Sequence, residues 1–336
     1  TLTVGSLSVS SIGGSDGFCL RIDLGSGNVF TPQNLRSYGN TSSDIINDVV
    51  LDNATNLRAY LVGSFYGTMN LEYANGTPFS VTSSGMQDGI VLELLQNTTS
   101  DLRPQDSNSI MKLGSTGNDA ILTVDYANSI FYIGGYFSET VDFDPNTAVA
   151  VNRTSSGLTD SFVAGYVVSA AIYPLRFVNI EGNATTDERT VSVSAATLSN
   201  TSLTHNVYSL TQRANTFGGI FTSLRKTDEF GNINAAFGGL IVSTANDKLV
   251  TPRGVFDIAN DDVYLAGNFN GTADFNTDGL ATFNMTALNS ATNGFTNNGF
   301  VEKFGNCTQS ASAPTITASS STNICSGSSV TLTASG

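Results

Sequence analysis

The sequence predicts an all-β protein, and residues 1–306 predict a β-propeller of four-stranded blades. Three observations support this fold class. Apolar and polar residues alternate in short runs, glycine and proline interrupt these runs, and a unit with the same layout returns along the chain. A sandwich does not need self-similar units, and a solenoid would have shorter ones. We therefore expect about five blades, the first of them incomplete.

Two stretches define the repeating unit, LVGSFYGTMNLEY and YIGGYFSETVDFD. Each is followed by a serine-glycine turn and a short apolar strand. The interval from Phe65 to Asp88 equals the interval from Phe137 to Asp160. This constant spacing indicates that the same strands and turns recur in the same order.

Further copies are less regular. LAGNFNGTADFNTDG carries the motif and has Asn298 in place of the aspartate, while a degenerate copy begins at Phe217 with FGGIFTS. The opening SIGGSDGFCLRID matches only the second half of a unit, so we expect a half-blade there. The expected blades span residues 1–30, 31–100, 101–172, 173–250 and 251–306. The fourth is expected to contain an insertion within TVSVSAATLSNTSLTHNVYSL.

The strands of one unit can be assigned in order. In the third expected blade they are AILTVDY, SIFYIGGYF, TAVAVNRT and SFVAGYVV, which are rich in β-branched and aromatic residues. Within a strand, glycine usually marks a bulge or a close backbone approach, which we expect at four positions: Gly63, Gly135, Gly219 and Gly267. The aspartate before the last strand is expected to bond amides of its turn.

The charge excludes some classes of partner. The chain carries 28 acidic and 14 basic residues, for a net charge of −14. Nucleic acid and anionic membrane surfaces both require lysine and arginine, so we expect neither as a partner. No stretch is long and apolar enough to span a bilayer, so we expect no direct membrane insertion.

A loop near the end of the last blade fits the opening of a calcium site. Asp274, Asn276 and Asp278 precede Gly279 in the pattern D-x-[DN]-x-[DN]-G, which supplies oxygen ligands for Ca²⁺. Position twelve is Met285, so the bidentate glutamate of an EF-hand is missing. A hairpin turn without metal explains the same residues, and both interpretations stay open.

The three cysteines do not form a metal motif. Cys19 lies in the incomplete first blade and Cys307 follows the last strand of the final blade. A disulfide between them would join the two ends of the ring, while the alternative is a buried free thiol at Cys19. The single histidine, His205, is expected to be a solvated loop or strand residue.

The motif G-x-F-x-G-T-x-D-F, followed by a Ser-Gly turn and D-x-F-V, resembles β-propeller repeats of secreted Bacteroidetes surface proteins. After a linker at residues 307–313, the tail 314–336 (PTITASSSTNICSGSSVTLTASG) resembles the start of the Ig-like repeats in large adhesins of these bacteria, including gliding-motility adhesins. Such proteins are exported by the type IX secretion system. The resemblance implies a truncated Ig-like β-sandwich, in which Cys325 would pair with a later cysteine.

These observations predict a non-enzymatic, extracellular cell-surface adhesin or a module at the tip of a filament. The resemblance transfers no catalytic residue, and the partner would be a surface glycan or another cell-surface or secreted protein. One alternative is a glycan-binding or glycan-processing module of a secreted enzyme. Aromatic residues and paired carboxylates around one mouth of the propeller would favour that alternative. A second alternative is a structural spacer, which would lack a concave polar pocket.

Overall fold

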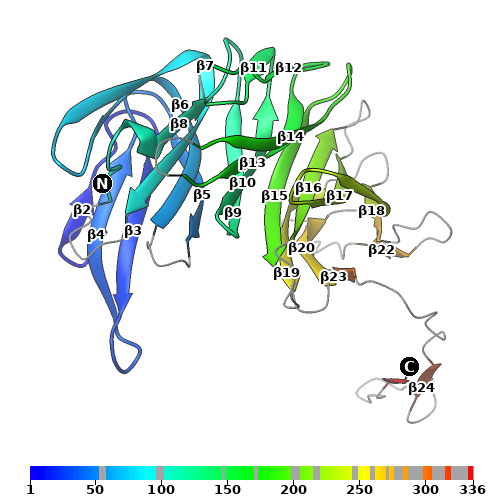
Figure 1. Ribbon diagram of the computed structural model, residues 1–336. Coiled ribbons are helices and arrows are strands. Elements are labelled where there is room, and N and C mark those ends of the chain that lie inside the picture. Colours follow the sequence, from blue (N-terminus) through cyan, green and yellow to red (C-terminus); the bar gives the residue numbers. More distant parts are fainter. Residues whose placement is uncertain are drawn as a thin grey trace.

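The structure is a computed structural model of the chain, and it shows antiparallel sheets that follow one another in chain order around an arc (Figure 1). The residues it describes are 1–52, 58–95, 102–145, 148–169, 173–197, 205–214, 220–243, 249–257, 262–269, 272–275, 283–286, 298–304, 315–318 and 332–335. A closed ring of sheets is not seen in this part of the chain.

The protein is all-β, as the sequence predicts. Over the described ranges the only helical element is the 3₁₀ turn η1 (Ser107–Ser109). None of the described helical structure has the length and apolar character needed to cross a membrane.

Three groups of four hydrogen-bonded antiparallel strands are present, two as four-stranded sheets and the third within a six-stranded sheet, which confirms the four-stranded unit. The first consists of β5 (Ile45–Leu51), β6 (Arg58–Glu72), β7 (Pro78–Leu95) and β8 (Ile110–Leu113). The second consists of β9 (Ala120–Ala127), β10 (Ile130–Phe137), β13 (Asp160–Val167) and β14 (Leu175–Glu181). The third consists of β15 (Glu188–Thr197), β16 (His205–Ala214), β17 (Ile220–Asp228) and β18 (Ile233–Ser243). We call these the first to fourth strands of a unit.

The remaining strands form smaller sheets and ribbons. A two-stranded sheet of β3 (Gly17–Leu24) and β4 (Phe30–Tyr38) precedes the complete sheets, and β19 (Leu249–Asp257), β20 (Asp262–Phe269) and β23 (Asn298–Phe304) follow them. The ribbons are β1 (Leu2–Val4) with β2 (Leu7–Val9), β11 (Thr140–Asp142) with β12 (Asn152–Thr154), and β21 (Thr272–Asp274) with β22 (Asn284–Thr286). The edge of β18 also pairs with β21.

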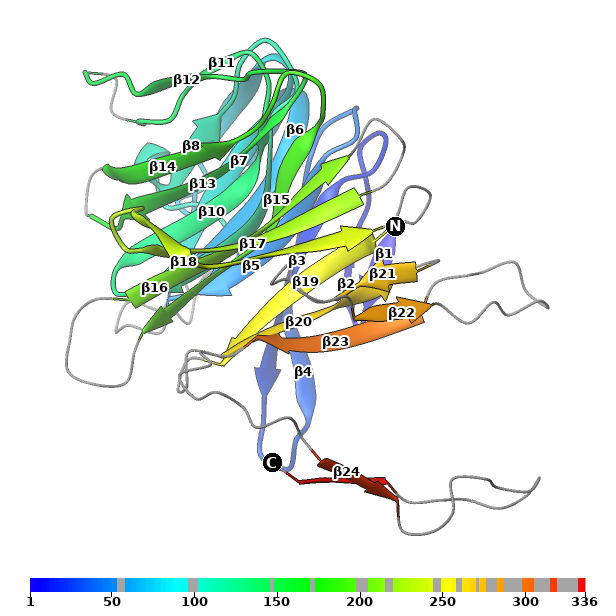
Figure 2. The ribbon, with the colours of Figure 1, turned by 90° about the vertical axis from the view of Figure 1, so that its right-hand side faces the viewer.

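The C-terminal strands β24 (Thr315–Ala318) and β25 (Leu332–Ser335) pair with each other. Both views show this hairpin apart from the other sheets (Figures 1 and 2). Two strands were expected here, while the Ig-like character of the tail stays a prediction.

The unit differs from the expected one in its strand composition. TAVAVNRT contributes β12 to a separate ribbon with β11, and the fourth strand of the sheet is β14, LRFVNIE. The first complete sheet likewise continues to β8, beyond the expected boundary at residue 100. The ribbon alternates in polarity like a sheet strand, so alternation alone could not distinguish the two.

The repeating motif sets the register between second and third strands. Phe65 lies opposite Asp88, Phe137 opposite Asp160, and Phe269 opposite Asn298. This confirms the equivalence of the three motifs across three sheets.

The strand glycines Gly63 and Gly135 lie where the adjoining first strand bulges. A Cβ atom at either position would overlap a backbone carbonyl of that strand, at Ile45 or Ala120. The predicted close backbone approach is therefore confirmed at both positions.

The predicted alignment of FGGIFTS with the glycine-phenylalanine motif of the other units is wrong. Phe221 is not equivalent to Phe137, because it lies on the third strand β17, opposite Arg213 of β16. Register instead places Arg213 at the phenylalanine position. The glycine-phenylalanine pair in FGGIFTS is therefore a chance match to the motif, and its residues are not structurally equivalent to those of the other units.

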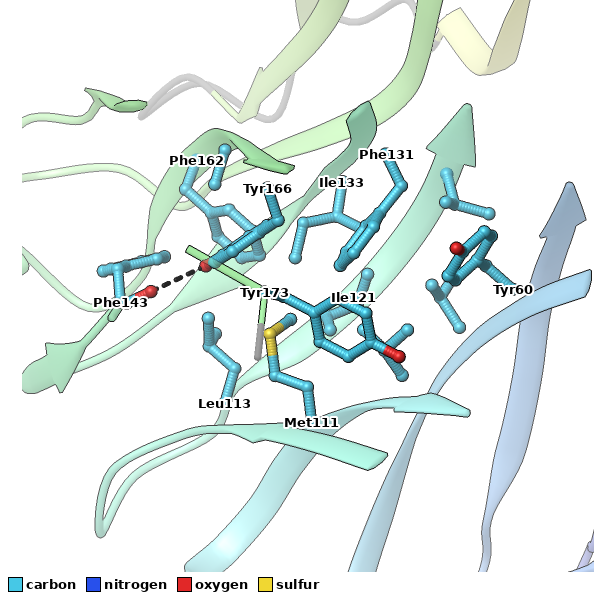
Figure 3. Close-up of a cluster of buried hydrophobic side chains, with 14 of the residues drawn as sticks. Tyr60, Met111, Leu113, Ile121, Phe131, Ile133, Phe143, Phe162, Tyr166 and Tyr173 are labelled. Carbon is cyan, nitrogen blue, oxygen red and sulfur yellow. Dashed lines mark hydrogen bonds between the residues drawn. The ribbon is translucent and has the colours of Figure 1, made fainter. Parts of the chain in front are cut away.

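Each pair of neighbouring sheets encloses a hydrophobic core. Between the first and second complete sheets, Tyr60 and Met111 pack with Phe131 and Tyr166 (Figure 3). Tyr166 also donates a hydrogen bond to the carbonyl of Phe143 at 2.9 Å. This face-to-face packing is the arrangement that a propeller requires of its blades.

An aromatic triad recurs in two units, formed by a second strand, a third strand and the residue after the ribbon strand between them. Phe137, Phe143 and Phe162 pack together, with the first two in edge contact at a centroid distance of 5.3 Å. The triad Phe269, Phe275 and Phe300 repeats this arrangement, with an edge contact at 5.4 Å. The expectation that Phe137 and Phe143 are buried is confirmed.

Side chains of the first strands join successive sheets. Asp48 of β5 accepts a hydrogen bond from the amide of Val124 in β9 at 3.1 Å. Asp125 of β9 in turn accepts one from the amide of Ala195 in β15 at 2.8 Å. These bonds set the first strands side by side along one edge of the arc.

Candidate functional site

A polar cavity of about 430 Å³ lies where the second strands end and the third strands begin. Its volume is within the range of small-molecule sites, about 300–1,000 Å³. The lining residues come from all three complete sheets and are mostly polar. They are Tyr66, Gln87, Asn118, Tyr136, Thr159, Asp187, Glu188, Arg189 and Gln212.

Strand alternation explains why Tyr136 faces this cavity. Phe137 points into the core between sheets, so its neighbour in the strand points to the opposite face. The Tyr136 hydroxyl donates a hydrogen bond to Gln87 Oε1 at 3.0 Å, and Gln87 Nε2 donates to Ser64 Oγ at 2.7 Å. This chain connects two sheets and fixes the Tyr136 ring at the cavity wall.

Burial raises the pKa of Tyr136, and the nearby Tyr66 and Asp119 add to the rise while Arg189 opposes it. Tyr136 is therefore a neutral hydrogen-bond donor at physiological pH. Tyr66 and Arg189 also line the cavity. Two half-buried aromatic rings and a guanidinium group thus share one wall.

Loops at this end of the sheets are held by three aspartates, of which Asp88 and Asp160 are buried and Asp16 is partly buried. Asp16, Asp88 and Asp160 each accept a hydrogen bond from the amide four residues earlier, at 2.8–2.9 Å. The turn-stabilising function predicted for them is confirmed. A side chain at Gly114 or Gly182 would overlap the carboxylates of Asp88 and Asp160 respectively.

A second series of acidic residues begins the first strands. Asp119 accepts the amide of Ser115 at 2.6 Å and the amide of Ser138 at 2.9 Å. Asp44 makes the corresponding bonds to the amides of Asn40 and Tyr66. Burial raises the pKa of both carboxyl groups, although these hydrogen bonds oppose the rise.

Glu188 is the equivalent acidic residue of the third complete sheet, and it lines the cavity. It is fully buried, and its Oε1 accepts hydrogen bonds from Arg213 Nε at 2.9 Å and from Asn183 Nδ2 at 2.9 Å. Burial raises its pKa, while Arg213 lowers it and Asp160 raises it further. The neighbouring Asp187 is exposed and accepts a bond from Thr159 at 2.9 Å.

The cavity wall therefore contains the rings of Tyr66 and Tyr136 and the carboxyl groups of Asp187 and Glu188, which are adjacent in the sequence. None of its residues was named from the sequence as a site residue. They come from three units, and only the folded register brings them together. The notable sequence signal was the run Asp187-Glu188-Arg189, which concentrates charge in a chain with few charged residues.

His205 does not fit the expectation of a solvated residue. It is buried on β16, where its Nε2 contacts the Tyr132 hydroxyl and its Nδ1 lies 3.3 Å from Asn128 Nδ2. Glu229 Oε2 lies 3.7 Å from Nδ1. A buried imidazole with polar partners on both nitrogens is accounted for by packing and hydrogen bonding.

The calcium ligands predicted from the sequence do not line this cavity, and two of them lie outside the described residues. Asp274 ends β21, opposite Asn284, while Asn276 and Asp278 lie outside the described residues. No group of three or more potential metal ligands is found within the described ranges. The calcium site therefore stays a prediction. At the related turn, Asp142 Oδ1 accepts the amides of Asp144 and Val151, which supports the hairpin interpretation there.

Cys19 lies on β3 and is partly buried, which raises the pKa of its thiol to about 11. It has no disulfide partner in the described ranges, but Cys307 and Cys325 lie outside them. The bond between Cys19 and Cys307 stays a prediction.

No protein-family model matches the chain, and no curated protein matches it. The resemblance to secreted surface proteins thus has no support beyond the motifs themselves.

Proposed function

We propose that this chain is a non-enzymatic binding module of an extracellular, cell-surface adhesin, built as a β-propeller. The cavity lined by Tyr66, Tyr136 and Gln212 is its ligand site. The observation that carries this proposal is a concave polar pocket. A structural spacer would not need such a pocket.

The chemistry of the wall favours a surface glycan as the ligand. Tyrosine rings can pack against the apolar faces of sugar rings, and amide groups can bond several hydroxyls at once. Gln87 and Gln212 supply amides, while Asp187 and Arg189 add a hydrogen-bond acceptor and a donor at the rim. The strongly acidic chain, with a net charge of −14, disfavours polyanionic partners.

The test measures binding of the whole chain to a panel of immobilised neutral and acidic glycans. Tyr136→Ala should weaken binding at least about tenfold, which corresponds to about 1.4 kcal/mol. Tyr73→Ala is the matched control, because Tyr73 stacks on Phe79 in the first unit and does not line the cavity. Equal affinities for both variants would refute the proposed site.

A glycan-processing enzyme is the second candidate, and the adjacent carboxylates Asp187 and Glu188 favour it. A buried carboxyl group with a raised pKa resembles the general acid of glycoside hydrolases. Against this function, Glu188 is already held by Arg213 and Asn183. Release of reducing sugar that disappears in Glu188→Gln would establish this candidate and refute the non-enzymatic proposal.

A further inference from the structure

Equivalent positions of the repeat differ greatly in burial at the N-terminal end of the arc. Phe18 lies two residues after Asp16, as Ile90 lies after Asp88 and Phe162 after Asp160. Phe18 is 53% exposed, whereas Ile90 is 1% exposed and Phe162 is fully buried. The three side chains lie on the third strands β3, β7 and β13, each two residues after the turn-binding aspartate, so their difference in burial reflects their surroundings.

A second position shows the same contrast in the first strands. Val49, Val124 and Val193 occupy equivalent places in β5, β9 and β15, opposite the second strand of each sheet. Val49 is 51% exposed, while Val124 and Val193 are each 5% exposed. One residue type at one position of the fold is thus covered in two sheets and uncovered in the first.

In the second and third complete sheets, the second strand of the preceding sheet covers this valine. Val124 packs in the core that also contains Tyr60 and Val62 of β6, the second strand of the preceding sheet. Val193 packs with Tyr132 of β10 in the same manner. The third strands β7, β13, β17 and β23 each also pair with a second strand. Among the described residues, β3 pairs with β4 alone.

We propose that the open edge of β3 and the exposed face of β5, marked by Phe18, Ile22 and Val49, form a docking surface for a β-hairpin. The hairpin has the character of the repeat's own first and second strands. Its second strand adds to β3 by backbone hydrogen bonds, and its apolar side chains cover the face. This interface continues the one already formed between the complete sheets.

The repeat itself specifies this occupant. Four third strands in the described ranges are bordered by a second strand, and two first strands there are covered by the preceding sheet. A helix or an irregular loop would leave the amide and carbonyl groups of the β3 edge unpaired. A hairpin with period-two alternation satisfies the edge and the apolar face together.

The test attaches a second copy of residues 118–138, the first and second strands of the second complete sheet, directly before Thr1 of the whole chain. In the intact unit, residue 139 leads into the ribbon of β11 and β12, and Thr1 leads into the corresponding ribbon of β1 and β2. The junction therefore has the same layout as the connection that follows β10. We expect the melting temperature to rise by at least about 5 °C and the amides of β3 to exchange more slowly with deuterium.

Two variants distinguish docking from a general effect of the added segment. Phe18→Ser with Ile22→Ser should abolish the rise in the extended chain, because both side chains lie in the interface. Leu158→Ser, at an exposed apolar residue in the loop before β13, should leave the rise unchanged. Both sets of substitutions are at solvent-exposed positions, so the chain itself should still fold.

Two results would overturn the proposal. An unchanged melting temperature together with unchanged β3 exchange would show that the hairpin does not dock. Alternatively, the unextended chain could be a dimer that Ile22→Lys dissociates, and the surface would then belong to a second copy of this chain. Ultracentrifugation of both chains decides between these outcomes.

Discussion

A matched pair of phenylalanine substitutions tests whether burial, and not position in the repeat, determines the contribution of each unit to stability. Phe162 and Phe18 occupy equivalent places, but Phe162 is buried against Phe137 and Phe143 whereas Phe18 is half exposed. Phe162→Ala removes a whole buried ring and leaves a cavity. A loss of about 3–5 kcal/mol in the free energy of unfolding is expected.

Phe18→Ala should cost much less. About half of its side-chain surface is already in water, so the lost transfer free energy is about 1 kcal/mol, and solvent fills the space without a cavity cost. Urea unfolding followed by tyrosine fluorescence measures both variants under the same conditions. Ile90→Ala, at the third equivalent position, should behave like Phe162→Ala.

Two outcomes would refute this reasoning. Equal losses at Phe18 and Phe162 would mean that Phe18 is covered in solution. A loss below about 1.5 kcal/mol at Phe162 would mean that the core between the sheets is loosely packed. The difference between the two variants is the informative quantity, because errors of extrapolation affect both in the same direction.

Three further predictions concern the loops and the acidic residues. Gly182→Ala should lower stability by about 1–3 kcal/mol, since the new methyl group overlaps a buried carboxylate, while Gly25→Ala has room and should be neutral in thermal melts. The pKa of Asp119 is raised in the folded state, so its contribution to stability is fully present below its unfolded pKa and is lost as pH rises through the folded value. Stability relative to Asp119→Asn should therefore decline across that interval in urea titrations at successive pH values, and a flat difference would contradict the shift. If the predicted calcium loop binds metal, chelation should lower the melting temperature, and Asp278→Ala should abolish that sensitivity; identical melts with and without chelator would leave the hairpin interpretation.

The sequence predicted the repeating part of the fold because the repeat fixes distance along the chain. The Phe65–Asp88 and Phe137–Asp160 intervals correspond to facing residues of adjacent strands. The all-β class, the four-stranded unit and the turn-binding aspartates followed from this regularity. The prediction was wrong in the fourth expected unit, where the motif is absent.

A better signal existed for the fourth unit. Register places a tyrosine at one position of every described second strand: Tyr60, Tyr132, Tyr208 and Tyr264. This series would have located β16 correctly, whereas the glycine-phenylalanine pair at Phe221 belongs to the following strand. Tyr208 is buried in the irregular unit, so its replacement by a smaller residue would leave a cavity in the core.

The candidate site could not be predicted in the same way. Its residues occupy equivalent positions of the repeat, but the residue type differs from one unit to the next. Ser64, Tyr136 and Gln212 occupy equivalent positions of three second strands, each beside the bulge of its first strand. A search for repeated sequence motifs does not detect such positions, because no residue type recurs at them. In the fold they lie at the same end of adjacent sheets, and two of them line the cavity while Ser64 accepts the bond from Gln87 that supports Tyr136.

This division has a physical basis. The positions that repeat, such as the buried aspartates and tyrosines, are constrained by packing between sheets, which is the same at every junction. The positions that line the cavity differ from unit to unit, because the cavity borders each of them on one side. A ring of identical side chains would give a symmetric surface without a preferred orientation for an asymmetric ligand. The departure of Tyr136 and Gln212 from a common residue is therefore what a specific binding site on a repeat protein requires. Exchanging the two, as Tyr136→Gln with Gln212→Tyr, should keep the fold and change the ligand preference in the glycan panel; an unchanged preference would show that recognition lies elsewhere on the molecule.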